Sequence, residues 1–161
     1  MKVKVKWLGK LTFTGSADSG FTVPLGTDQS VGGDDDGPRP LELMAIGMAG
    51  CTAMDVISIL SKKRQDVTWF EVQAHIQRAQ EHPKVFTAAV IEYFVAGHSI
   101  DEAAVVRAIE LSVTRYCPAY AMFSQIMPFE MKYHIFEDQG TDQRSLVKSG
   151  TFVVPEELVQ A

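Results

Sequence analysis

The two cysteines of this chain are the residues whose type and setting point most directly to chemistry. Cys51 lies in the apolar, small-residue segment LELMAIGMAGCTAMDVISIL, and Cys117 lies in RYCPAY, 66 residues later. The N-terminal residues lack the apolar core of a signal peptide, so we expect a cytoplasmic protein. A permanent structural disulfide is not expected in that compartment. The two thiols are therefore either inert or a redox pair.

Cys117 has the clearer physical argument for reactivity. Pro118 favours the first position of a helix, which places Cys117 at the N-cap. Backbone N–H groups and the helix dipole favour an anion there, and they predict a lowered thiol pKa. Arg115 is close enough in sequence to add a positive charge. The alternative interpretation is a buried capping residue without chemistry.

Cys51 is expected in the middle of a helix, where no helix end assists ionisation of the thiol. Asp55 lies four residues further on and therefore on the same helix face. A carboxylate there would raise the thiol pKa if both groups were shielded from water. Taken alone, this setting favours a small core residue over a reactive thiol.

Composition argues against several other classes of site. The formal net charge is −5 and no basic patch is present, which disfavours nucleic-acid binding. No uncharged apolar run reaches about 18 residues, so no membrane span is predicted. The 4 histidines show no ligand spacing, and two cysteines do not complete a zinc site, so we expect no metal.

The pattern of apolar residues predicts an α+β fold in a single domain, residues 1–161. Alternating apolar and polar residues predict half-buried strands, the first with Val3 and Val5 on its buried face. The expected strands cover residues 3–7, 10–15, 20–26, 67–79, 84–97 and 128–138. The folded core is expected over about residues 3–136, followed by a polar tail at 139–161.

A long helix is expected from Pro40 to about Lys63. Small residues recur every four positions along it, at Ala45, Ala49 and Ala53. Small residues let another helix approach closely. In a chain of this length, a second subunit is a candidate for the element that covers this face.

Two further helices are expected between the last two predicted strands. The first covers residues 99–116, with Ser99 as its cap and Glu102 completing a capping box. The second begins at Cys117.

The segment GPRPLELMAIGMAGCTAMDV, followed by RYCPAY, resembles the OsmC/Ohr family of cysteine-based peroxidases. The shared features are a Gly-Pro-x-Pro start, an acidic residue soon after it, and a helix with one cysteine. A second cysteine follows at the start of another helix. VGG before this segment, KKRQDV after it and IELSVTRYCP are similar to the OsmC-like branch. The resemblance covers roughly residues 3–136.

The resemblance implies an intertwined homodimer, with antiparallel sheets wrapped around a long central helix that carries Cys51. It implies reduction of organic hydroperoxides and, more weakly, of hydrogen peroxide. Cys51 matches the peroxidatic cysteine, which becomes a sulfenic acid, and Cys117 matches the resolving cysteine, which condenses with it to a disulfide. A dithiol reductant, such as a lipoylated protein or thioredoxin, resets the pair. No metal, haem or flavin is implied.

Two positions depart from the family pattern. Many active members carry an N-terminal arginine that pairs with the thiolate, but this chain has no arginine before Arg39. Arg39, Arg115 or a lysine would have to substitute. The family glutamate directly follows the proline, whereas here Leu41 follows it and the acid is Glu42. In a straight helix Glu42 faces away from Cys51. It can assist catalysis if the chain bends before the helix, or if it serves the site of the partner subunit. The alternative is a carboxylate that the helix dipole favours at the helix start.

The leading hypothesis is a thiol peroxidase that defends against organic hydroperoxides. The alternative, favoured by the two departures, is a dimeric small-ligand-binding or redox-sensing protein with little turnover. A cysteine hydrolase with a histidine base is disfavoured because no histidine lies in a motif.

Overall fold

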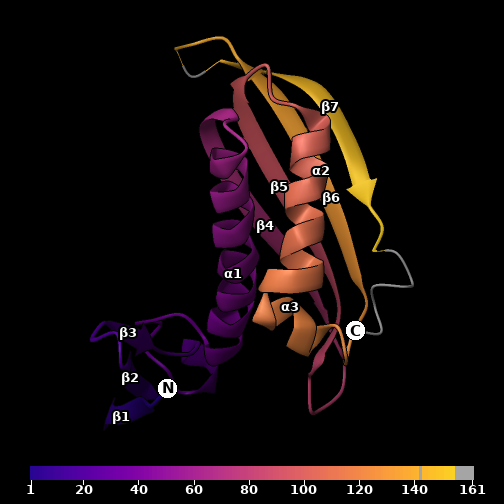
Figure 1. Ribbon diagram of the computed structural model, residues 1–161. Helices are drawn as coiled ribbons and strands as arrows, with labels where there is room; N and C mark the ends of the chain where they lie inside the picture. Colours follow the sequence, from indigo (N-terminus) through magenta and orange to yellow (C-terminus); the bar gives the residue numbers. More distant parts are fainter. Residues whose placement is uncertain (142, 155–161) are drawn as a thin grey trace. The chain divides into compact units, whose positions relative to one another are not determined.

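The structure is a computed structural model that describes residues 1–141 and 143–154. The chain forms two compact units, Met1–Ile46 and Gly47–Ala161. Helix α1 (Pro40–Lys62) starts in unit 1 and continues through unit 2 (Figure 1). Its bounds confirm the predicted long helix. That the two units act as one domain stays a prediction.

Unit 1 is a small antiparallel sheet, as the alternation of its residues predicts. Its strands pair in the order β1-β2-β3. They are β1 (Val3–Gly9), β2 (Thr12–Ala17) and β3 (Thr22–Leu25), followed by the short helix η1 (Gln29–Val31). The expectation of a buried face on the first strand is wrong for the single chain, because Val3 and Val5 are 70% and 61% exposed. Unit 1 supplies no second layer over that face.

Unit 2 is built on a mixed sheet with the strand order β4-β5-β6-β7. The strands are β4 (Asp66–Arg78), β5 (Phe86–His98), β6 (Phe129–Asp138) and β7 (Arg144–Phe152). The outer pairs are antiparallel, but β5 and β6 are parallel. Helices connect these two strands, and such a crossover is what parallel neighbours require. The α+β fold predicted from the sequence is confirmed, with this one parallel pair added.

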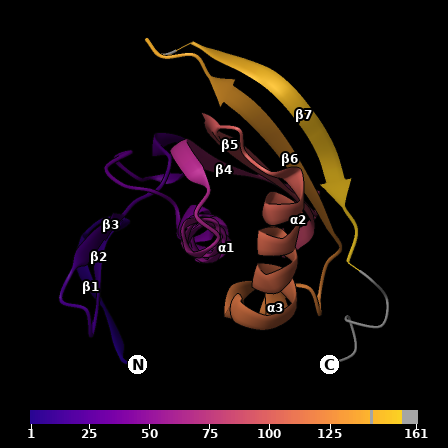
Figure 2. The same ribbon diagram turned by 45° about the horizontal axis from the view of Figure 1, so that its top comes forward.

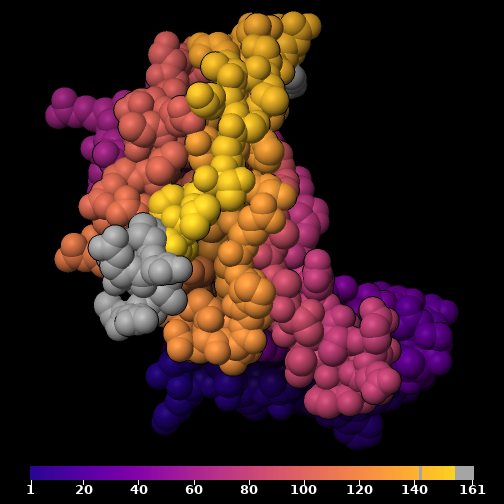
Figure 3. All heavy atoms as spheres, turned by 90° about the vertical axis from the view of Figure 1, so that its right-hand side faces the viewer, coloured from indigo at the N-terminus to yellow at the C-terminus, as the bar shows by residue number. Residues whose placement is uncertain are grey.

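Strand β7 forms from the segment that the sequence predicts as a polar tail. It pairs with β6 at the edge of the sheet and lies along the surface of unit 2 (Figure 3). Leu146 and Val147 are both exposed, so this strand lacks the clear two-residue alternation of a half-buried one. Residue 142 and residues 155–161 of the predicted tail lie outside the described residues.

The helices of unit 2 all lie on the same side of its sheet (Figure 2). After α1 they are α2 (Glu102–Leu111), the π-helical turn η2 (Ser112–Tyr116) and α3 (Pro118–Phe123). The predicted cap of α2 is wrong. Asp101, not Ser99, accepts the N–H of Ala103, while Ser99 has a φ of 52° and donates its N–H to Glu137. An aspartate next to the helix start therefore takes the capping role from the serine two residues earlier.

Helix α1 is apolar on more of its surface than unit 2 covers. By length and hydropathy it could cross a bilayer, with 22% of its most apolar window buried, but the core helix of a soluble protein passes the same test. Met54 is 69% exposed, and a Cβ at Gly47 or Gly50 would meet open space. Asp55 interrupts the apolar run. The exposed face fits the expectation that a second subunit covers it.

Candidate functional site

Unit 2 brings the two cysteines together beside an acidic side chain. The Sγ atoms of Cys51 and Cys117 and a carboxylate oxygen of Asp55 lie within 4.8 Å of one another. Cys51 and Asp55 share a face of α1 because they are four residues apart. Cys51 is half-buried, whereas Cys117 is only 3% exposed. The family resemblance implied that the two thiols meet, but the spacing of the cysteines in the sequence does not predict this proximity.

The turn between α2 and α3 places Cys117 beside Cys51 and Asp55. The backbone N–H of Cys117 donates to the Ser112 carbonyl at 2.8 Å, which closes the wide π-turn η2. Such turns are frequent at functional sites. Cys117 then caps α3, and the Tyr120 N–H donates to its Sγ at 3.3 Å. The predicted N-cap position of Cys117 is therefore confirmed.

The predicted lowering of the Cys117 pKa is wrong. Burial raises the pKa of the Cys117 thiol to about 12, and its hydrogen bond with Cys51 acts in the same direction. The Tyr120 N–H lowers this pKa, but it does not offset the burial. Removal from water disfavours a thiolate more than the start of a six-residue helix favours it. Burial therefore keeps Cys117 protonated at neutral pH.

A chain of buried hydroxyl groups leads to Asp55. The Tyr93 Oη lies 2.7 Å from Thr52 Oγ1, and Thr52 Oγ1 lies 2.9 Å from Ser112 Oγ. Ser112 donates its proton to Asp55 Oδ2 at 3.0 Å. Because a serine hydroxyl has one proton, Thr52 must donate to Ser112, and Tyr93 must donate to Thr52. This order aims every hydroxyl of the chain toward the carboxylate.

The sequence did not predict that these hydroxyl groups lead to Asp55. Ser112 is fully buried, and nothing in the sequence connected it with Asp55. Thr52 stands beside Cys51 in a largely apolar helix, and that was the available signal. Tyr93 carried none, because a tyrosine in a central strand is ordinary core.

Two hollows of very different size adjoin the cluster. A small void of about 10 Å³ is lined by Cys117, Thr52 and Tyr93 together with apolar side chains. An open hollow of about 420 Å³ is lined by Asp55, and its other lining residues are Ser58, Ile59, Lys62, Lys63, Leu111 and Tyr116. Solvent-borne reagents therefore have room on the Asp55 side, while the Cys117 side is packed.

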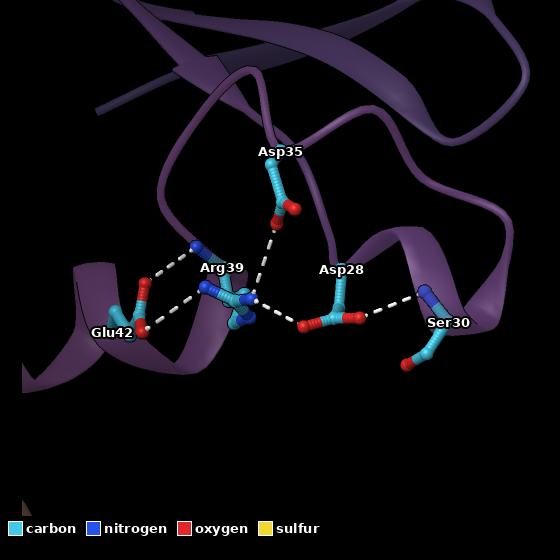
Figure 4. Close-up of polar contacts among 5 residues, drawn as sticks. All are labelled: Asp28, Ser30, Asp35, Arg39 and Glu42. Carbon is cyan, nitrogen blue, oxygen red and sulfur yellow. Dashed lines mark hydrogen bonds and ion pairs between the residues drawn. The ribbon is translucent and has the colours of Figure 1, made fainter.

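Glu42, the third predicted site residue, belongs to an ion-pair cluster in unit 1 (Figure 4). Its Oε2 accepts the backbone N–H of Arg39 at 2.9 Å, and its Oε1 lies 3.7 Å from Arg39 Nη1. Arg39 Nη2 also contacts Asp28 at 3.2 Å and Asp35 at 3.4 Å. These contacts fit the helix-start interpretation of Glu42. Its action on Cys51 stays a prediction.

The other predicted substitutes for the missing arginine have contacts of their own. The Arg115 guanidinium carbon lies 5.5 Å from the centre of the Tyr116 ring. Lys10 pairs with Asp34 at 2.7 Å in unit 1, and this contact raises the pKa of the lysine.

The cluster also contains the donors that could hold a metal ion. Cys51, Asp55 and Cys117 offer three ligands within a suitable separation. Thiol ligands must lose their protons to bind a metal, and burial opposes this at Cys117. The donor set therefore fits a thiol pair better than a zinc site, and the expected absence of a metal stays a prediction.

Comparison with known proteins places the chain in a family. It matches the OsmC-like protein family over residues 33–132. It is 36% identical over 135 residues to protein YhfA of Escherichia coli K12, covering 84% of this chain and 98% of YhfA. A crystal structure of a hypothetical protein from Aquifex aeolicus VF5 superimposes with a TM-score of 0.74 at 25% identity, covering 86% of this chain and 97% of that one.

A more distant structure extends the likeness of fold. The organic hydroperoxide resistance protein OsmC from Legionella pneumophila has a TM-score of 0.58 at 12% identity, covering 84% of this chain and 96% of that one. The family match and the identity to YhfA confirm the resemblance inferred from the two cysteine segments. The chain belongs to the OsmC-like protein family.

Proposed function

We propose that this protein is a thiol peroxidase that reduces organic hydroperoxides and, more weakly, hydrogen peroxide in defence against oxidative stress. The observation that carries the proposal is the separation of the Cys51 and Cys117 sulfur atoms, which is at most 4.8 Å. Proteins of the same fold from Legionella pneumophila and Elizabethkingia anophelis are organic hydroperoxide resistance proteins. A pair of thiols at this separation is suited to the same chemistry.

Cys51 is the attacking thiol in the proposed cycle. It is the more accessible of the two, and Cys117 keeps its proton because burial raises its pKa to about 12. The Cys51 thiolate attacks one oxygen of the hydroperoxide, an S–O bond forms and the O–O bond breaks. The alkoxide leaves and takes up a proton to become the alcohol. Cys51 is thereby oxidised to a sulfenic acid.

Cys117 resolves the sulfenic acid. Its sulfur attacks the Cys51 sulfur, the S–O bond breaks, and the oxygen leaves as water. A disulfide has an S–S bond of about 2.05 Å, so the two sulfurs have to approach by less than about 3 Å. A dithiol reductant, such as a lipoylated or thioredoxin-like protein, then returns both residues to thiols.

Two further parts of the proposal concern the setting of the site. We propose a cytoplasmic homodimer, supported by the exposed apolar side chains of α1 and of unit 1. In unit 1, an open apolar hollow of about 270 Å³ is lined by Val3, Val5, Phe21 and Val23 together with other residues of this unit. Sedimentation equilibrium should give twice the chain mass of 17.8 kDa. A monomer at all concentrations would refute this part.

Glu42 is proposed as an accessory group that orients Arg39. Their ion pair supplies a carboxylate and a guanidinium at the start of α1. Glu42→Gln should slow sulfenic acid formation on Cys51 if this pair assists the attack. An unchanged rate would leave Glu42 with its helix-start role only.

The test of the proposed function is a thiol count on reduced protein before and after one equivalent of cumene hydroperoxide. Mass spectrometry should show rapid loss of two hydrogens and one peptide in which Cys51 is linked to Cys117. Cys117→Ser should instead allow Cys51 to oxidise further to a sulfinic acid, and Cys51→Ser should not react. If both thiols of the wild type stay free for many minutes, the protein is not a peroxidase.

The second candidate is a redox sensor or small-ligand binder with little turnover. It is favoured by the contacts of Arg39 with three carboxylates of its own unit, which compete with a thiolate for the guanidinium. Disulfide formation without steady-state peroxide consumption in the presence of a dithiol would distinguish it from the peroxidase.

A further inference from the structure

We propose that Asp55 accepts the proton of Cys117 when Cys117 attacks an oxidised Cys51. The assignment deepens the proposed two-cysteine cycle and rests on it, because it names the group that makes the resolving thiol reactive. The positions of the two cysteines do not by themselves identify this group. It follows from three features of unit 2: the position of the carboxylate, the hydrogen bonds that hold it, and the burial of the thiol.

The first feature is position. A carboxylate oxygen of Asp55 lies within 4.8 Å of the Cys117 Sγ and of the Cys51 Sγ. Catalytic hydrogen bonds are often long in a free enzyme and shorten in the reacting complex. Asp55 also lines the open hollow, so it can exchange protons with solvent, which the buried Cys117 cannot do directly.

The second feature is orientation. Ser112 donates to one carboxylate oxygen, Oδ2, and is itself held by Thr52 and Tyr93. The same Ser112 accepts the backbone N–H of Cys117 at its carbonyl. Ser112 therefore holds the Asp55 carboxylate with its side chain and the Cys117 backbone with its carbonyl. This shared contact keeps Asp55 beside Cys117 during the small movement that disulfide formation needs.

The third feature is that Cys117 needs a proton acceptor. Burial raises the pKa of the Cys117 thiol, so the thiolate is rare at neutral pH. The other titratable groups that face the pair are Tyr93 on β5 and Tyr120 on α3, and burial raises the pKa of both phenols. Protonated phenols do not accept this proton. Among the described residues that face Cys117, Asp55 is the remaining base.

The proposed step balances as follows. The Cys117 S–H bond breaks and its proton passes to Asp55. The Cys117 sulfur bonds to the Cys51 sulfur, and the S–O bond of the sulfenic acid breaks. The departing hydroxide takes the proton from Asp55 and leaves as water. The two sulfurs end as a disulfide, and Asp55 returns to its carboxylate.

The experiment separates this step from peroxide chemistry by using dithiodipyridine, a small disulfide that releases a coloured thiopyridone. Cys51 attacks the reagent, so one thiopyridone leaves and a mixed disulfide forms. Cys117 then attacks the Cys51 sulfur and displaces the second thiopyridone. Stopped-flow absorbance on the reduced wild type should therefore show two phases, and Cys117→Ser should show one. The second phase reports deprotonation of Cys117 whether or not the protein reduces hydroperoxides.

Asp55→Asn is the decisive variant, because asparagine keeps the shape and does not accept the proton. We expect the second phase at pH 7 to slow by about 100-fold, a typical contribution of general-base catalysis. Its rate should then rise about tenfold per pH unit, because hydroxide must take the proton. In the wild type it should stay nearly flat around neutral pH. Asp55→Glu should recover much of the rate, and Glu81→Gln, in the exposed turn before β5, is the matched control.

Two results would overturn the assignment. One is an Asp55→Asn second phase that is slowed equally at every pH, which indicates a structural role. The other is a wild-type second phase that already rises tenfold per pH unit, and this outcome needs no variant. The charged groups that line the hollow beside Asp55 are Lys62 and Lys63. If the wild type shows both phases with dithiodipyridine but does not react with cumene hydroperoxide, the proposed peroxidase function is refuted and the role of Asp55 is retained.

Discussion

Removing the middle hydroxyl of the buried chain should destabilise unit 2 strongly. Thr52→Val keeps the shape of the side chain and replaces its hydroxyl with a methyl group. Thr52 is 4% exposed, and its hydroxyl contacts Tyr93 at 2.7 Å and Ser112 at 2.9 Å, both of them fully buried. The substitution therefore breaks two hydrogen bonds at a site that water does not reach.

The magnitude follows from what is left without a partner. The Tyr93 hydroxyl loses its acceptor, and an unsatisfied buried donor costs about 1–3 kcal/mol. Ser112 still donates to Asp55, so its loss is one net hydrogen bond, about 1 kcal/mol. The sum predicts a fall of about 2–4 kcal/mol in the free energy of unfolding.

Equilibrium urea unfolding of the reduced protein, at one fixed concentration, measures this change. Thr87→Val, at an exposed position near the start of β5, is the matched control and should stay within about 0.5 kcal/mol of wild type. Adding Tyr93→Phe to Thr52→Val removes the orphaned donor, so the double variant should lose at least about 1 kcal/mol less than the sum of the single changes. A Thr52→Val change as small as that of Thr87→Val would refute the hydrogen-bond chain.

Two further predictions test the packing of unit 2. In Cys51→Ser protein, the rate of Cys117 alkylation by iodoacetamide should rise with pH and reach no plateau below about pH 10. Burial raises the pKa of this thiol, so the reactive thiolate stays rare. A plateau near pH 8 would instead show a thiol of ordinary pKa. Gly97→Ala should lower the free energy of unfolding by about 3 kcal/mol or more, because the new Cβ would lie 2.0 Å from the Asp66 carbonyl oxygen across the β4–β5 pair. A melting temperature unchanged by Gly97→Ala would contradict that contact.

Local sequence was sufficient for most elements of the fold. Helix α1 starts at Pro40 as predicted, since proline fits the first helical turn. The alternation of β4 correctly predicted a strand, and the two-sided apolar pattern of β5 is typical of the central strand that it forms. These features depend on residues near one another in the chain, which share one element and one periodicity.

The sequence-based predictions failed where two nearby residues could fill the same role, or where a strand is largely exposed. Ser99 and Asp101 both qualify as caps for α2, and the backbone path into the helix selects Asp101. β7 is exposed on much of its surface, so its apolar residues do not mark a face. The burial expected for Val3 needs a second layer that unit 1 does not contain.

The sequence by itself determined which groups could react: two thiols, one of them a helix N-cap, and an aspartate one helical turn from the other. Only the tertiary structure decided that these groups meet, because Cys51 and Cys117 are 66 residues apart and belong to different helices packed on one sheet. It also decided the sign of the Cys117 pKa shift. A helix end acts locally and can be predicted from Pro118, but the burial that outweighs it is supplied by side chains from α1, β5 and β6.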